Sequence, residues 1–148
     1  MTAKTNHEEG IALKAAFGDA HDANHPNTYY MGLIASITDG EAQNWTEVTG
    51  DGYARVAVAN TSANWDLTNG GATDANGDGV ADNATVPNVN AIEWATMSAQ
   101  KTAVAVAWFD AASGGNARFY HEFGSSVTIP AGVQARFASG ALTFQEDN

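Results

Sequence analysis

The sequence predicts an all-β protein: an antiparallel β-sandwich or barrel of about seven or eight short strands with one short N-terminal helix. Three observations favour this fold. Apolar and polar residues alternate with a period of two in several segments of the chain. Turns that contain glycine or proline separate these segments at regular intervals. A chain of 148 residues, of which 44% are hydrophobic, is long enough to bury one core.

The helix is expected near the N-terminus, over residues 7–17. Apolar residues recur there at helical spacing, Asn6 can cap the first turn and Gly18 can terminate the last. A polar, proline-containing segment follows and is expected to be a loop. We therefore divide the chain into an N-terminal arm with a short helix, residues 1–28, and a β-sandwich domain, residues 29–148.

The expected strands begin at Tyr29, where the hydrophobic period changes. The segment 102–109 places Val104, Val106 and Trp108 on one face of a strand. Glycine and asparagine in "DAASGGN" predict a hairpin loop directly after it, because these residues tolerate positive φ. The other expected strands are 29–37, 53–59, 91–97, 117–123 (with Phe119, His121 and Phe123 on one face), 126–129, 133–138 and 141–145.

Charge and composition exclude several classes of protein. Seventeen acidic residues face six basic ones, which are scattered singly, so the formal net charge is −11. A nucleic-acid-binding protein needs clustered Lys and Arg to neutralise phosphates, so no nucleic-acid partner is expected. No apolar run approaches the roughly 18 to 20 residues of a membrane helix, and the polar start does not resemble a signal peptide. We therefore expect synthesis in a cytoplasm and no membrane partner. The absence of cysteine excludes disulfides and thiolate metal sites.

A calcium loop is the strongest chemical motif. Asp74, Asn76 and Asp78 follow the D-x-N-x-D-G pattern, in which three side-chain oxygens on alternate residues face one cation. Val80 could add its carbonyl oxygen and Asp82 stands at the ninth position. The loop lacks the glutamate at the twelfth position and the flanking helices of an EF-hand. Two interpretations therefore stand: a structural Ca²⁺ site on a β scaffold, or an exposed acidic turn. No other cofactor is expected.

The remaining candidates for chemistry are weak. His21 and His25 are four residues apart, but they lie in a proline-containing loop, where two ligands rarely hold zinc. Glu93 and Glu122 could be nominated as a glycosidase pair only because acidic residues are abundant. His121 is more typical of a core or interface histidine. Because no nucleophile motif or nucleotide-binding loop occurs, we expect that the chain is not an enzyme.

The four tryptophans could stack on sugars, but in a small β protein such residues are more often core or interface anchors. Trp65 is the best candidate for an exposed contact, because it lies in a long polar stretch, residues 60–83. The other tryptophans are Trp45, Trp94 and Trp108.

Several segments in order resemble a family of small β-sandwich virion proteins of tailed bacteriophages, described as capsid decoration (cement), head-fibre or tail-fibre-like proteins. The segments are "YYMGLIAS" with its Y-x-G-L pattern, "WTEVTGDGYARVAVAN" with E-V-x-G-x-x-Y-A-R, "AVAWFDAASGGNARFYHEF" with D-A-x-S-G-G-N, and "VTIPAGVQARFASGALTF" with P-A-G followed by F-x-x-G-x-L. The resemblance covers roughly residues 7–145. This sequence departs from the family in the acidic insert at 69–83, which contains the calcium motif.

The resemblance implies a structural virion protein without an active site. The first expectation is a homotrimeric capsid decoration protein that lies on the capsid surface and stabilises contacts with the major capsid protein or another virion protein. In that case the arm 1–28 would reach across subunits, and Tyr29, Tyr30 and Trp65 would be anchors. The alternative is a tail or head fibre or tip domain that binds a host surface glycan or receptor through the 60–83 loop.

Overall fold

The computed structural model describes residues 2–5, 26–61, 63–66 and 83–147. Every regular element in these residues is a strand, and every strand pairing is antiparallel. The expected all-β antiparallel fold is therefore confirmed, whereas the helix expected over 7–17 lies outside the described residues. In the described part no helix is long and apolar enough to cross a membrane. The strands are β1 (Thr2–Lys4), β2 (Thr28–Asp39), β3 (Asn44–Glu47), β4 (Val56–Ala59), β5 (Asn83–Pro87), β6 (Ile92–Glu93), β7 (Lys101–Phe109), β8 (Ala117–Ile129), β9 (Arg136–Phe137) and β10 (Thr143–Asp147).

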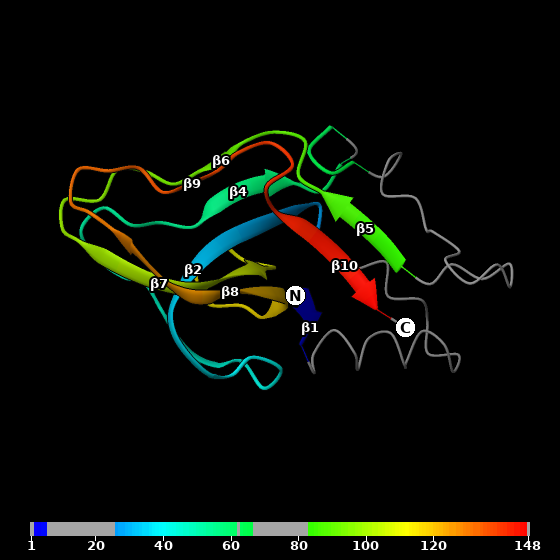
Figure 1. The fold of residues 1–148 in the computed structure, drawn as a ribbon, viewed down its shortest axis with the longest axis horizontal. Coiled ribbons are helices and arrows are strands. Elements are labelled where there is room, and N and C mark those ends of the chain that lie inside the picture. The colour runs from blue at the N-terminus through cyan, green and yellow to red at the C-terminus, as the bar shows by residue number, and fades with distance from the viewer. Residues whose placement is uncertain (1, 6–25, 62, 67–82, 148) are drawn as a thin grey trace, which may run out of the picture.

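The main sheet has the strand order β1-β8-β7-β2-β3, with β4 also paired to β2 (Figure 1). The long strand β2 pairs with β4 through Thr28–Met31 and with β3 through Ile34–Asp39. Its other edge pairs with β7. This central position explains why the sequence of β2 is nearly continuously apolar, since both of its faces are covered.

The second layer consists of two short ribbons, β6–β9 and β5–β10. Figure 1 shows β6 and β9 across from β7 and β8, and the main core lies between these layers. Met31 and Trp108 enter it from the main sheet, and Ile92 and Trp94 enter it from the second layer. All four side chains are at most 3% exposed. The expected strand at 91–97 is thus shorter than predicted and ends at Glu93.

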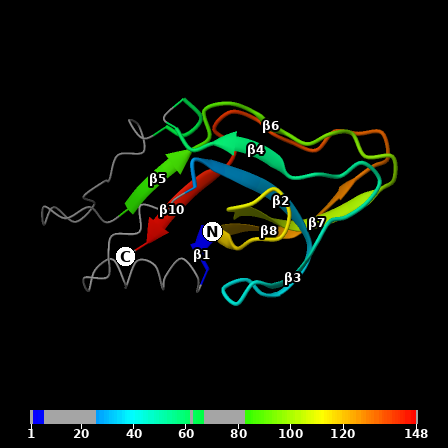
Figure 2. The same ribbon diagram turned by 180° about the vertical axis from the view of Figure 1, so that it is seen from behind.

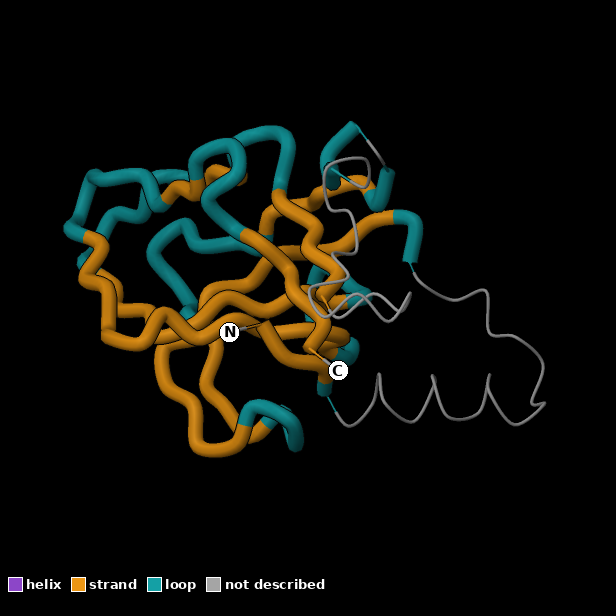
Figure 3. Tube along the Cα trace, turned by 45° about the vertical axis from the view of Figure 1, so that its right-hand side comes forward, coloured by secondary structure: helices purple, strands orange, loops and turns teal. Residues whose placement is uncertain are grey.

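A smaller apolar cluster covers the opposite face of the main sheet. It includes Ile34 from β2 and Phe109 from β7. Half-buried Trp45 packs over it, with ring centroids 6.2 Å from Phe109 and 6.0 Å from Tyr120. The turn between β2 and β3 lies on the side away from β6 and β9 (Figures 2 and 3). The hairpin therefore shields a face that would otherwise be open.

Buried Asn88 ties the β5–β10 ribbon to the turn after β9. Its side-chain Nδ2 donates to the carbonyls of Asn90 and Ala138, both at 2.8 Å. Its Oδ1 accepts the N–H of Leu142, also at 2.8 Å. Since a buried amide is costly unless its hydrogen-bonding groups are satisfied, these three bonds specify one arrangement of the connecting segments.

Two predictions about side-chain placement are wrong. Val104 does not share a face with Val106 and Trp108, because a register irregularity between Ala103 and Ala105 changes the alternation and turns Val104 toward the smaller cluster. Trp65 is not an exposed contact residue. It is 5% exposed and packs in the main core, with its ring centroid 6.3 Å from that of Trp108.

The predicted N-terminal arm begins with residues that belong to the main sheet. Strand β1 pairs with β8, with Ala3 opposite Tyr120. Thr5 is fully buried, and its hydroxyl donates to the carbonyl of Ala117 at 2.7 Å. The division of the chain at residue 28 stays a prediction, because residues 6–25 lie outside the described part.

Candidate functional site

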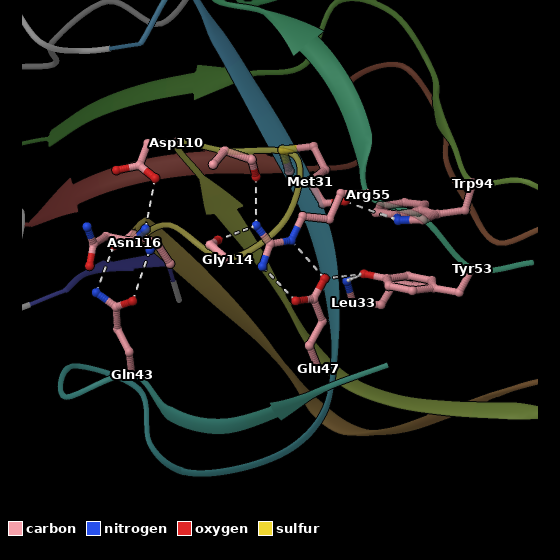
Figure 4. Close-up of polar contacts among 12 residues, drawn as sticks. Met31, Leu33, Gln43, Glu47, Tyr53, Arg55, Trp94, Asp110, Gly114 and Asn116 are labelled. Carbon is pink, nitrogen blue, oxygen red and sulfur yellow. Dashed lines mark hydrogen bonds and ion pairs between the residues drawn. The ribbon is translucent and has the colours of Figure 1, made fainter. Parts of the chain in front are cut away.

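The strongest polar cluster of the described residues surrounds Arg55. Its guanidinium binds the Glu47 carboxylate with two parallel bonds, Nε to Oε1 at 2.8 Å and Nη2 to Oε2 at 2.7 Å. Its Nη1 donates to the carbonyls of Ala111 at 2.7 Å and Gly114 at 2.8 Å. The guanidinium also stacks on Phe109, 3.4 Å from the ring centroid. Figure 4 shows Arg55 between Glu47 and the loop that joins β7 to β8.

Tyr53 completes this cluster. Its hydroxyl donates to Glu47 Oε1 at 2.9 Å and accepts the backbone N–H of Leu33 at 2.7 Å. Burial, and then the neighbouring Glu47 carboxylate, raises the pKa of Tyr53 well above its ordinary value. Gly32 leaves the necessary room, since a Cβ there would lie 2.7 Å from Phe109 and 2.9 Å from Glu47 Oε1. The tyrosine is therefore a neutral hydrogen-bonding group.

The loop over residues 110–116 is held from two further sides. Asp110 Oδ1 accepts the N–H of Asn116 at 2.8 Å, and both Gly114 and Gly115 have positive φ. The Gln43 side-chain amide accepts the N–H of Ala117 at 2.9 Å and donates to its carbonyl at 3.1 Å, as a neighbouring strand would (Figure 4). The predicted hairpin loop is thus confirmed.

The polar cluster is closed to a ligand. The Arg55 side chain is 6% exposed, and its hydrogen-bonding nitrogens are directed at groups of the chain itself. The cluster as a whole joins three segments of the chain: the Y-x-G-L segment, where Leu33 donates to Tyr53, the second motif, which supplies Glu47, Tyr53 and Arg55, and the 110–116 loop. The cluster therefore acts as a lock between elements.

An apolar groove of about 400 Å³ opens on the described surface. It lies between the β8 end of the main sheet and the β9 side of the second layer. Leu33, Trp94 and Ala103 contribute to its lining from the core, and Phe123 and Phe137 form walls with ring centroids 5.9 Å apart. An apolar concavity of this size is typical of a binding or assembly surface.

The groove has little polar chemistry. Among the described residues that line the groove, Arg136 is the only charged one, and it is ion-paired with Glu93 at 2.8 Å. Gln134 and Thr128 add neutral polar atoms at the exposed side. Without convergent ionisable groups, the groove suits an apolar contact better than catalysis.

Most of the predicted chemical residues lie in parts of the chain that the structure does not describe. Asp74, Asn76, Asp78, Val80 and Asp82 lie outside the described residues, and the Ca²⁺ site stays a prediction. The same holds for His21 and His25. Glu93 and Glu122 lie in different sheets. Within the described chain no three metal-ligating side chains gather.

His121 lies where the alternation of β8 predicted it, opposite Val106 and on the face that carries Phe119 and Phe123. Its ring is 6.3 Å from that of Phe123. Burial lowers the pKa of His121 below its ordinary value of 6.5.

The lowered pKa of His121 predicts a loss of stability in acid. In the unfolded chain the His121 side chain has a pKa of about 6.5, so below that pH the unfolded chain binds more protons at this site than the folded chain does. The stability that His121 contributes above roughly pH 6.5 is therefore lost as the pH falls through the lower pKa of the folded protein. We expect the melting temperature of the protein to fall more between about pH 7 and about pH 5 than that of His121→Gln. Parallel thermal melts of both proteins measure this, and identical pH profiles would contradict it.

The groove escaped the sequence analysis because its walls come from separate strands. The signal that could have pointed to it is the run "FGSSVTIPAGVQA", residues 123–135, which contains no charged residue in a strongly acidic chain.

A family model described as Podophage GP4 fiber I protein gp80 matches residues 3–145. The chain belongs to this family. The fiber I match spans almost the whole sequence and confirms the resemblance to virion proteins of tailed phages. The chain is accordingly a structural component of a phage virion. No curated protein matches it.

Proposed function

We propose that this chain is a structural subunit of a virion fibre and not a capsid decoration protein. The observation that carries the proposal is the family match, whose description names a fiber and which extends over residues 3–145. Its partner is then a neighbouring fibre or tail protein, in place of the major capsid protein.

The described structure supports a role in assembly and not in catalysis. Its main polar cluster is satisfied internally, and its groove lacks convergent ionisable groups. Each basic side chain that the structure describes is paired with a carboxylate, which leaves the acidic groups in excess and disfavours a nucleic-acid partner. The pairs are Arg55–Glu47, Lys101–Asp51, Arg118–Asp110 and Arg136–Glu93.

Glycan binding is not part of this proposal. Trp65, Trp94 and Trp108 are at most 5% exposed, and Trp45 is half-buried against Phe109. These are the side chains best suited to stack on sugar rings. The described part of the chain therefore offers no exposed tryptophan platform.

The location of the chain on the particle tests the proposal. We expect a cryo-electron-microscopy map of the parent virion, together with gold-labelled antibody against this chain, to place it in fibres. Label confined to capsid subunit junctions would overturn the fibre assignment and restore the decoration role. Antibody against the major capsid protein is the matched control for access to the head.

A further inference from the structure

We propose that the chain self-associates through the open edge of its sandwich, with the apolar groove and the outer edge of β8 forming the contact surface for a second copy. We call this surface the β8 edge surface; it comprises β8 from Glu122 to Ile129 and the following turn, residues 130–135. The inference stands whether the chain belongs to a fibre or to another part of the virion.

Exposed apolar side chains gather at this surface. Three large hydrophobic side chains of the described residues are exposed, and two of them, Val127 and Val133, line the groove. They are 47% and 48% exposed. The third, Val89, is 39% exposed and lies outside the groove. Clustering of exposed valines around a concave apolar wall is typical of a surface that another molecule covers.

The edge of the main sheet is open at the same place. Strand β1 pairs with β8 only along Phe119–His121. From Glu122 to Ile129, no strand of the described chain pairs with the outer side of β8. An open edge is a template for association with another chain.

A bulge in β8 determines the kind of contact. Between the pairs Ala105–Glu122 and Ala103–Val127, β7 advances two residues and β8 advances five, so β8 contains three extra residues. Gly124, within this bulge, has a φ of 75°. A bulge interrupts a continuous hydrogen-bonded ladder. We therefore expect side chains of the groove rim to supply most of the interface.

Charge identifies the occupant. The chain carries a net charge of −11, so two copies repel each other over most of their surfaces. Residues 123–135 contain no charged side chain, and Arg136 beside them is already paired with Glu93. A basic partner would be attracted to the acidic surface instead of this neutral region. A second copy brings the same neutral region to both sides of the contact, so the repulsion between two acidic chains is smallest there.

The proposed contact uses both the groove and the edge of β8. A stable interface buries about 800 Å² on each partner, which is more than the groove alone can supply. The β8 edge and the 130–135 turn must therefore contribute. A closed arrangement related by symmetry lets each copy bury the same apolar rim.

The test is the oligomeric state of the whole chain, measured by light scattering after size exclusion and by sedimentation. We expect a mass that is a multiple of 15.4 kDa. The double variant Val127→Asp/Val133→Asp should weaken association at least about tenfold, because it places unpaired carboxylates in the contact. Val89→Asp is the matched control and should leave association unchanged. Added salt should strengthen association of the unmodified chain by screening the repulsion.

Several outcomes would overturn the proposal. These are a monomer at every concentration, an oligomer that the double variant does not weaken, or equal weakening by Val89→Asp. A monomer that instead captures another virion protein through this surface would also overturn it and assign the edge to that partner. Thermal melts check that each variant folds. If the aspartates prevent folding, Val127→Ser/Val133→Ser removes the apolar rim without adding charge, and it must weaken association if the proposal holds.

Discussion

Replacing Arg55 by alanine is expected to lower the free energy of unfolding by about 3 to 5 kcal/mol, because it leaves a largely buried carboxylate without its partner. The Glu47 side chain is 23% exposed and accepts two of the Arg55 bonds. The same substitution releases the carbonyls of Ala111 and Gly114 and uncovers the Phe109 ring. Urea unfolding followed by tryptophan fluorescence measures the change.

Two controls separate the geometry of Arg55 from its charge. Arg55→Lys keeps the charge but cannot reproduce the forked contact, so it should recover only part of the loss. Lys101→Ala removes the Lys101–Asp51 pair, in which the Asp51 side chain is 42% exposed, and should cost no more than about 1 kcal/mol. If Arg55→Ala costs as little as Lys101→Ala, the cluster is not the lock described above.

Trp94→Ala is expected to have an effect of similar size, about 3 to 5 kcal/mol, because it removes the largest fully buried side chain of the main core. The indole Nε1 also donates to the carbonyl of Met31 at 3.2 Å (Figure 4). Without the ring, a cavity opens below the groove and the carbonyl loses this donor. Urea unfolding again provides the measurement.

A matched pair of conservative variants isolates the hydrogen bond of Trp94. Trp65 is also buried, but its Nε1 has no hydrogen-bond partner among the residues that the structure describes. Trp94→Phe should therefore lower the free energy of unfolding by about 1 kcal/mol more than Trp65→Phe does. The Trp94 variant loses a hydrogen bond, whereas the Trp65 variant removes an unsatisfied donor. Equal costs would show that the Trp94 bond contributes nothing to stability.

The described architecture agrees with a virion component that works by contact. Its loops are held by side-chain bonds to distant strands, such as Gln43 to Ala117 and Arg55 to the 110–116 loop. Such bonds keep the surface pre-organised, and this lowers the entropic cost of assembly. If the chain assembles with neighbouring virion proteins as proposed, this rigidity favours that assembly.

The sequence by itself determined the elements whose signal is local. Alternation of period two placed Phe119, His121 and Phe123 on one face of β8, and glycine placed the hairpin at 110–116. The change of hydrophobic period at Tyr29 predicted the strand over 29–37, which is β2 in the structure. These features follow from backbone geometry, which acts over a few residues and is therefore visible in a short window.

Only the tertiary structure decided the features that depend on distant residues. Polar neighbours made Trp65 look exposed, yet the packing of β7 and the second layer buries it. The register irregularity between β7 and β8 turns Val104 to the other face without a compositional signal. The lock joins Arg55 to Ala111 and Gly114, which lie 56 and 59 positions further along the sequence. The groove between β8 and β9 likewise exists only where two layers meet, because it is formed by strand packing and not by any one segment.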